Sequence, residues 1–342
     1  MVNTLRTAIG IVFKTSIDFF CVNPESYAKS GEDVGLVWLD PISEFLIVGE
    51  IKQAAAVNAV VPVRLAGYWY GQRGTDGMVG QSAGPDEKVI YELHGGGWVW
   101  DSACMCEEML RYTKDQGCTR AFQIEYRLSQ GSLFPPKGAF PAALIDAIAG
   151  YNYLVNDLGF KPSNILITGE SAGGNLAFAL VRYLVNASIR SPPPPRAQFL
   201  LSPTADWGRT HIGPDSTMQC NSDSDIVTWF LGGYGTRALL GNLPESDACD
   251  NSWISPGSAK LPHVEGCFSG MPPTLIMGGD AEMTLDSMKA LRDRLVADNG
   301  EKKVTYVEVA DTTHIVMCMK WHEPQKTVAY EEFATWVKSI HQ

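Results

Sequence analysis

Four short stretches of the sequence hold residue types that together can carry out nucleophilic catalysis. The first is Gly169-Glu170-Ser171-Ala172-Gly173-Gly174, which follows an apolar, β-branched run and precedes a helix-forming run. This pattern predicts a strand, a sharp turn and a helix with Ser171 at the turn, since glycines permit a backbone that larger side chains would block. A hydroxyl at a helix amino terminus lies where N–H groups favour developing negative charge. Ser171 is the predicted nucleophile; the alternative is that small residues only allow close packing.

The second stretch is a run of three glycines directly after a predicted strand at residues 88–93. The sequence there reads His94-Gly95-Gly96-Gly97-Trp98. Glycine loses the most backbone entropy on folding, so three in succession are unfavourable unless the bare backbone is needed. The N–H groups of such a loop can approach a substrate closely and form an oxyanion hole. The alternative is a flexible spacer.

The third and fourth stretches supply a base and an acid. Serine is a weak nucleophile at neutral pH and needs an adjacent base. His314, which follows a predicted strand at residues 304–309, can take the proton. A carboxylate is then needed to orient the imidazole, and both Asp280 and Glu282 follow the predicted strand at residues 273–277. Because parallel strands open on one edge of a sheet, we expect these side chains to lie together there.

The bulk properties are those of an ordinary globular protein. The chain has 342 residues, of which 45% are hydrophobic and 19% are charged. Its net charge of −11 and its pI near 5.0 argue against a nucleic-acid-binding surface, which requires a basic face. Eight cysteines occur without a C-x-x-C pair or zinc-finger spacing, so we expect no metal site and no cofactor. We interpret them as free thiols, with one or two disulfides as the open alternative.

Strands that alternate with helices predict an α/β fold with a mostly parallel central sheet and helices on both faces. Residues 1–60 carry apolar residues at helical spacing and are predicted to form N-terminal cap helices. Residues 61–342 form the predicted catalytic domain. Within it, residues 208–262 are rich in Asp, Ser, Gly and Asn, and so long a segment between two strands predicts a cap over the site.

The N-terminal region does not resemble a signal peptide or a membrane anchor. An apolar patch at residues 8–13 is interrupted by Lys14 and Asp18, and no small-x-small cleavage site follows. The patch is also too short to span a bilayer. We therefore expect a cytoplasmic protein without an integral membrane segment, with secretion as the alternative. The oligomeric state stays open, a homodimer included.

In combination, the motifs resemble those of the hormone-sensitive-lipase-like carboxylesterases, a family with the α/β-hydrolase fold and a helical cap. The resemblance implies that Gly96, Gly97 and Ala172 supply the oxyanion N–H groups, with Gly95 at the turn. It also implies a cap built from the N-terminal helices and the insertion. The matching segments are His94-Gly95-Gly96-Gly97, Tyr126-Arg127-Leu128, Phe140-Pro141-Ala142, Gly169-Glu170-Ser171-Ala172-Gly173-Gly174, Leu201-Ser202-Pro203 and His314.

The family's acid motif helps to choose between the two carboxylates. It reads acid-x-Leu-x-Asp, counted from a proline that opens the strand. Counted without gaps from Pro273, the acid falls on Glu282 and the second aspartate on Asp286, while Leu285 lies one position later than the motif's leucine. Glutamate is an accepted acid in this superfamily. We therefore favour Glu282, with Asp280 as the alternative.

The resemblance implies a serine carboxylesterase that hydrolyses short-to-medium acyl esters of small molecules through an acyl-enzyme. One alternative is an amide or formamide hydrolase, because His94-Gly95-Gly96-Gly97-Trp98 also fits the arylformamidase pattern. Others are an enzyme of secondary metabolism that catalyses elimination or cyclisation, and a non-catalytic small-molecule receptor. Trp98, Trp229 and Phe230 are candidates for the substrate pocket, although they could equally be ordinary packing between cap and body.

Overall fold

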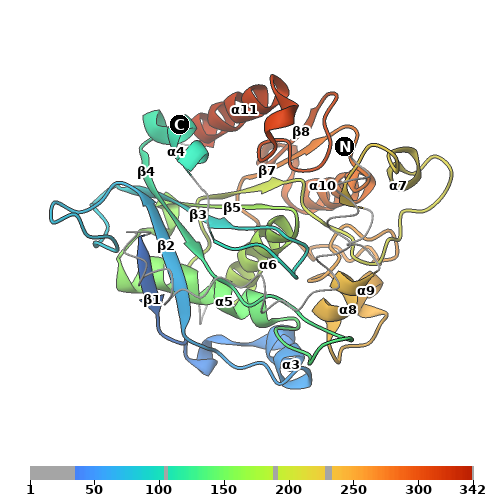
Figure 1. Cartoon of the computed structure of the whole chain (residues 1–342), viewed down its shortest axis with the longest axis horizontal. Coiled ribbons are helices and arrows are strands. Elements are labelled where there is room, and N and C mark those ends of the chain that lie inside the picture. The colour runs from blue at the N-terminus through green and yellow to red at the C-terminus, as the bar shows by residue number, and fades with distance from the viewer. Residues whose placement is uncertain (1–34, 104–106, 188–191, 228–232, 341–342) are drawn as a thin grey trace.

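A computed structural model describes residues 35–103, 107–187, 192–227 and 233–340 (Figure 1). Within these ranges the chain forms one eight-stranded sheet, in the order β1-β2-β4-β3-β5-β6-β7-β8. The strands are β1 (Leu36–Leu39), β2 (Leu65–Gly71), β3 (Lys88–Leu93), β4 (Cys118–Ile124), β5 (Ile165–Glu170), β6 (Ala197–Leu201), β7 (Thr274–Gly279) and β8 (Val304–Val309).

The sheet is mostly parallel, which confirms the predicted fold class. β1 and β2 pair antiparallel, as do β2 and β4, and every other pairing is parallel. The loop after β2 looks like a hairpin connection in the sequence, but β2 pairs with β1 and β4 and not with β3. Residues 72–87 therefore cross to the far side of β4, where β3 pairs parallel with both β4 and β5.

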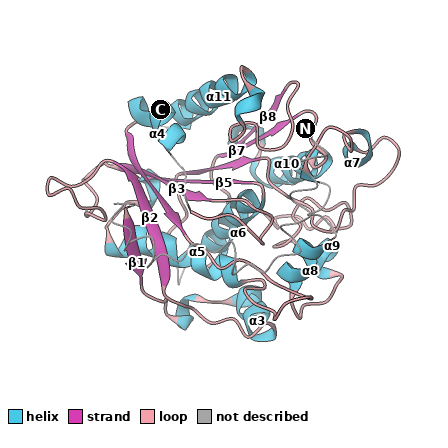
Figure 2. Cartoon of the chain, in the orientation of Figure 1, coloured by secondary structure: helices cyan, strands magenta, loops and turns pink. Residues whose placement is uncertain are grey.

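Helices cover both faces of the sheet (Figures 1 and 2). One apolar core joins one face of the sheet to α5, α6 and α10, and a second joins the other face to α4 and α11. Val89 and Tyr91 of β3 belong to the first core and Ile90 to the second, which explains the continuous apolar run of this strand. The helices are α3 (Gly49–Val57), α4 (Glu107–Thr113), α5 (Ala142–Asn152), α6 (Ala172–Asn186), α7 (Thr217–Cys220), α8 (Tyr234–Leu240), α9 (Asp247–Asp250), α10 (Leu285–Asn299) and α11 (Gln325–Ile340).

The predicted N-terminal cap helices account for only part of residues 1–60. Residues 1–34 lie outside the described residues, and β1 is a strand of the main sheet rather than a helix, as its apolar Leu-Val-Trp-Leu sequence allows. α3 is the helix described in this region. Asn58, directly after it, donates from Nδ2 to the carbonyls of Phe140 at 2.6 Å and Leu240 at 3.0 Å. The end of α3 is thereby joined to α8, which belongs to the 208–262 insertion.

Several sequence predictions concern groups that the structure describes in part. Cys21, Cys104 and Cys106 lie outside the described ranges, and the five described cysteines are free thiols. No group of three or more His, Cys, Asp or Glu side chains within the described residues is arranged to hold a metal ion. No helix of the described chain is both long and apolar enough to cross a membrane.

Candidate active site

Ser171 lies on a sharp turn between β5 and α6. Its backbone has φ 56° and ψ −119°, a conformation that L-residues rarely adopt. The neighbouring glycines make the turn possible. A Cβ atom on Gly169 would lie 2.2 Å from the carbonyl oxygen of Gly173, and one on Gly173 would lie 2.1 Å from that of Leu93. The strained turn directs the Ser171 hydroxyl away from the sheet at the amino end of α6.

The imidazole of His314 connects Ser171 with Glu282. His314 Nε2 lies 2.8 Å from Ser171 Oγ, and His314 Nδ1 lies 3.0 Å from Glu282 Oε2. His314 is 3% exposed, and Glu282 is completely buried. These are hydrogen-bond distances, and the order of the three groups is the one that activates a hydroxyl for nucleophilic attack.

Asp280, the alternative acid, does not lie beside the imidazole. Its side chain is exposed, and its Oδ1 accepts a hydrogen bond from the backbone N–H of Thr312 at 3.4 Å. Its own N–H donates to the carbonyl of Val309, so the turn after β7 is tied to the end of β8. In the described part of the chain, no hydrogen bond joins Asp280 to His314.

The Glu282 carboxylate accepts three further hydrogen bonds, which fix its orientation. Oε1 accepts from Ser202 Oγ at 2.6 Å and from the N–H of Gly279 at 2.7 Å, while Oε2 accepts from Thr284 Oγ1 at 3.0 Å. Ser202 Oγ also accepts from the N–H of Ile315, the residue after His314. Sequence reasoning assigned no role to Ser202, although it lies in the matched Leu201-Ser202-Pro203 segment.

The pKa of His314 is raised above its ordinary value. Burial alone lowers the pKa of this imidazole, but the hydrogen bond and the negative charge of Glu282, together with the charge of Asp225, outweigh that effect. An imidazole with a raised pKa is a stronger base and holds a proton more readily. Asp225 is fully buried in the 208–262 insertion and was not singled out from the sequence.

The glycine loop after β3 is held from two sides. The N–H of Gly95 donates to Glu170 Oε1 at 2.6 Å, and the hydroxyl of Tyr126 donates to the carbonyls of His94 at 2.7 Å and Gly95 at 3.0 Å. Gly96 has φ +86°, and a Cβ atom there would lie 2.1 Å from the carbonyl oxygen of Trp100. The loop therefore needs glycine at this position for its shape.

Three N–H groups near Ser171 have no hydrogen-bond acceptor among the described residues. They belong to Gly96, Gly97 and Ala172, the residues for which the family resemblance implies an oxyanion role. Ala172 is the first residue of α6, where N–H groups lack a partner within the helix. Such groups favour an anionic oxygen.

His94 belongs to the support of this loop. Its ring stacks on Tyr126, with centroids 4.0 Å apart and an interplanar angle of 10°, and its Nδ1 lies 3.2 Å from the carbonyl of Gly95. Burial lowers the pKa of His94 to about 4, so the imidazole is neutral at physiological pH. No hydrogen bond connects it to Ser171 within the described chain.

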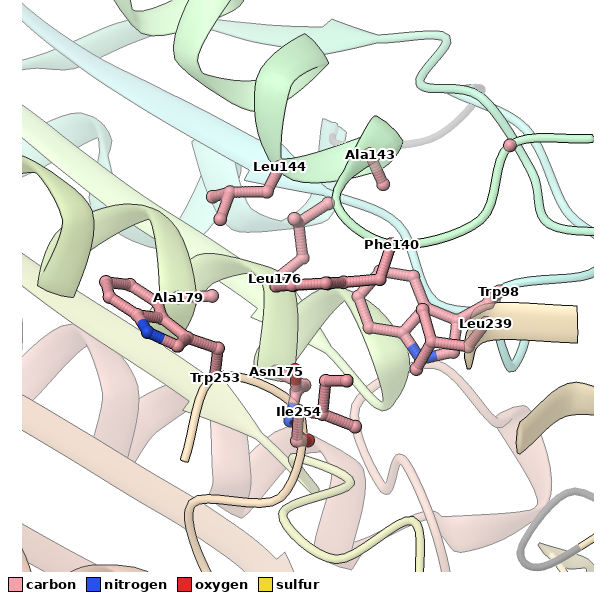
Figure 3. Close-up of a pocket in the computed structure, with 11 residues that line it drawn as sticks. Trp98, Phe140, Ala143, Leu144, Asn175, Leu176, Ala179, Leu239, Trp253 and Ile254 are labelled. Atoms are coloured by element: carbon pink, nitrogen blue, oxygen red, sulfur yellow. Dashed lines mark hydrogen bonds between the residues drawn. The ribbon is translucent and has the colours of Figure 1, made fainter. Parts of the chain in front are cut away.

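An apolar pocket begins one helical turn beyond Ser171. Apart from two tryptophan indoles, Asn175 is the polar side chain among its described lining residues. It follows Ser171 by one turn of α6, and its Nδ2 donates to the carbonyls of Thr204 at 3.0 Å and Ile254 at 2.9 Å. Figure 3 shows side chains from α5, α6, α8 and the glycine loop converging on this space. Trp229 and Phe230 lie outside the described residues. The lining residues are Trp98, Gly138, Phe140, Ala143, Leu144, Asn175, Leu176, Ala179, Leu239, Trp253 and Ile254.

Comparison with known proteins identifies the family. A family model described as the α/β-hydrolase fold matches residues 90–318, which is more than half of the chain. The chain belongs to this family. The match extends from β3 to the loop after His314, so the family region contains the glycine loop, Ser171 and Glu282.

Relatives and solved structures agree with the family. An acetyl-hydrolase of Streptomyces hygroscopicus is 28% identical over 239 residues, which cover 70% of this chain and 70% of the relative. An esterase of Acinetobacter venetianus is 26% identical over 247 residues, which cover 72% of this chain and 70% of the relative. An esterase from the bacterial hormone-sensitive lipase family has a TM-score of 0.61 at 23% identity, covering 99% and 98% of the two chains; this likeness shows the fold.

The predicted family with the α/β-hydrolase fold is thereby confirmed. The two relatives, an acetyl-hydrolase and an esterase, agree with the predicted carboxylic ester hydrolase. The alternative of a non-catalytic small-molecule receptor is disfavoured, because these relatives are an acetyl-hydrolase and an esterase.

Proposed function

We propose that this α/β-hydrolase is a serine carboxylesterase that hydrolyses short-to-medium acyl esters of small molecules through an acyl-enzyme. Ser171 is the nucleophile, His314 the general base and acid, and Glu282 the group that orients the imidazole. The N–H groups of Gly96, Gly97 and Ala172 form the oxyanion hole. The observation that carries the proposal is the buried imidazole with Ser171 Oγ at 2.8 Å and a Glu282 oxygen at 3.0 Å.

Acylation begins when Ser171 Oγ attacks the ester carbonyl and its proton passes to His314 Nε2. The imidazolium that forms is stabilised by the Glu282 carboxylate, whose oxygens lie within hydrogen-bond distance of four donors. The carbonyl oxygen gains negative charge and accepts hydrogen bonds from the loop and from the amino end of α6. The C–O bond to the leaving alcohol then breaks, and His314 returns the proton to that oxygen.

Deacylation repeats these steps with water as the nucleophile. Neutral His314 accepts a proton from a water molecule, whose oxygen attacks the acyl carbon bound to Ser171. The same N–H groups stabilise the second tetrahedral intermediate. The carboxylic acid leaves as the bond to Ser171 Oγ breaks, and the hydroxyl regains its proton from His314.

The pocket supports a preference for short hydrocarbon acyl chains. It is enclosed by aromatic and aliphatic side chains, and the amide of Asn175 is already bonded to two carbonyls. Such a lining favours an apolar group and provides no charged partner. The name of the Streptomyces relative, an acetyl-hydrolase, also supports a small acyl group.

Hydrolysis of p-nitrophenyl esters from acetate to laurate tests this proposal. Wild type should turn over the short esters, and Ser171→Ala should lose several orders of magnitude in kcat. Ser163→Ala is a matched control, since Ser163 lies in the turn before β5, at the opposite end of the strand from Ser171.

Two results would contradict the proposal. A folded wild-type protein that is inert on every ester would exclude simple esterase activity, and aryl formamides would be the next substrates to assay. A Ser171→Ala variant with wild-type activity would exclude the proposed nucleophile. Trapping of a stable acyl-enzyme at Ser171, read by mass spectrometry after brief reaction with substrate, is the direct test of the intermediate.

A further inference from the structure

The 208–262 insertion makes an extensive set of hydrogen bonds to the loop that carries Glu282. The N–H of Thr217 donates to Asp286 Oδ2 at 2.8 Å, and Thr217 Oγ1 accepts from the N–H of Asp286 at 3.1 Å. Asn221 Nδ2 donates to the carbonyl of Glu282 at 2.8 Å, and Ser224 Oγ donates to that of Ala281 at 3.2 Å. The short helix α7 accordingly packs against α10 (Figure 1). These hydrogen bonds hold this part of the insertion against the loop that carries Glu282 and the start of α10.

Asp225 is the last of the insertion residues in this set, and the other three, Thr217, Asn221 and Ser224, have no ionisable side chain. It is fully buried, and its Oδ2 accepts from the N–H of Met283, the residue after Glu282, at 2.7 Å. Its Oδ1 accepts from the N–H of Ile226 at 2.6 Å. Two N–H donors to a single buried side chain are the surroundings that a carboxylate requires.

The geometry assigns Asp225 as a second acidic positioning residue of the site, which holds the backbone beside Glu282 and adds a negative charge that stabilises the imidazolium of His314. It acts on His314 by its charge and on Glu282 through the peptide of Met283. This inference rests on the proposed function, because it concerns the base of that same reaction. It also gives Thr217, Asn221, Ser224 and Asp225 a role in supporting the catalytic acid, beyond covering the substrate.

Charged and titratable side chains around His314 come from several elements. Asp225 differs from those described next because it is fully buried and accepts a hydrogen bond from the N–H of Met283. Glu282 follows β7 and bonds to the imidazole directly. Asp280 is exposed and bonded to Thr312, and Glu170 is bonded to Gly95. His322 Nε2 lies 3.2 Å from Thr313 Oγ1, and burial lowers the pKa of His322.

Asp225 and His314 act on each other in the expected directions. Burial raises the pKa of Asp225, and the charge of Glu282 raises it further, whereas His314 and the two N–H donors lower it. The charge of Asp225 in turn raises the pKa of His314, together with Glu282. Removing this charge therefore lowers the pKa of His314 and weakens it as a base.

The test compares the pH dependence of kcat/KM for p-nitrophenyl acetate in three proteins: wild type, Asp225→Asn and Asp223→Asn. Asp223→Asn is the matched control, because Asp223 is exposed, lies two residues before Asp225 and loses an equal charge. We expect the acidic limb of Asp225→Asn to move to lower pH by about half a unit to one unit, less than for a directly paired charge. Its kcat should fall about tenfold, and Asp223→Asn should match wild type.

A loss of folded enzyme that is equal at every pH lowers kcat and leaves the acidic limb in place, so it is distinguished from the expected shift. If Asp225→Asn yields no folded protein, Asp225→Ser removes the charge and leaves a smaller polar side chain at the same buried position. An acidic limb unchanged in the folded variant, or moved equally by Asp223→Asn, would overturn the inference while leaving the esterase proposal intact. An inert wild type would instead contradict the proposed function.

Discussion

Replacement of Glu282 by glutamine removes one charge from the centre of the site and preserves the shape of the side chain. In the structure this carboxylate accepts hydrogen bonds from His314, Ser202, Gly279 and Thr284. An amide has one oxygen and one NH2 group, so at least one of these donors would face another donor. The substitution therefore affects both the orientation of the imidazole and its protonation.

The expected loss has two sources. Without a carboxylate at Nδ1, the imidazole can adopt the tautomer that does not accept a proton from Ser171, and loss of the equivalent group in serine hydrolases costs about 10⁴ in kcat. The negative charge that raises the pKa of His314 is also lost, so the acidic limb of the remaining activity should move to lower pH. A buried hydrogen bond to a charged group contributes about 1.5–3 kcal/mol, so the free energy of unfolding should fall by a similar amount.

Kinetics with p-nitrophenyl acetate and urea unfolding together measure both effects. Asp280→Asn is the matched control, since it makes the same kind of change at an exposed carboxylate two residues away, and it should retain kcat within about threefold of wild type. The reasoning would be refuted if Asp280→Asn lost as much kcat as Glu282→Gln. It would also fail if folded Glu282→Gln kept more than about a tenth of the wild-type kcat.

Three further predictions concern other parts of the site. Trp98→Leu should enlarge the apolar pocket, so the ratio of kcat/KM for hexanoate to that for acetate should rise several-fold; an unchanged ratio would exclude this pocket as the acyl site. Tyr126→Phe removes both hydrogen bonds to the His94 and Gly95 carbonyls, so kcat should fall about tenfold or more with KM little changed, and a change in KM alone would contradict an oxyanion-loop effect. In wild type, kcat/KM should fall as pH drops through the raised pKa of His314, because the protonated imidazole cannot act as a base. The stability that protonation of His314 contributes should be complete below about pH 6.5 and should be lost as pH rises through the raised pKa. An acidic limb of kcat/KM below an ordinary histidine pKa would contradict this assignment.

Local sequence patterns were sufficient for the strands of the central sheet. The predicted strands at residues 88–93 and 304–309 are apolar or β-branched runs, and β3 and β8 have these bounds. β3 is readable because a strand buried on both faces is apolar at most positions, and β8, a partly buried edge strand, is readable from its β-branched residues. The strand β1 was less readable: it has only four residues, and its neighbours carry helical patterns.

The sequence by itself determined the catalytic candidates Ser171 and His314, the glycine loop and the α/β class, because each depends on residue types within a few positions of one another. Tertiary structure decided which carboxylate faces His314. Asp280 and Glu282 are two residues apart, and the turn that ties the Asp280 N–H to β8 leaves Asp280 exposed and buries Glu282. Asp225 was beyond the reach of any local pattern, since it lies 57 residues before Glu282 and meets that loop only when the insertion folds across it.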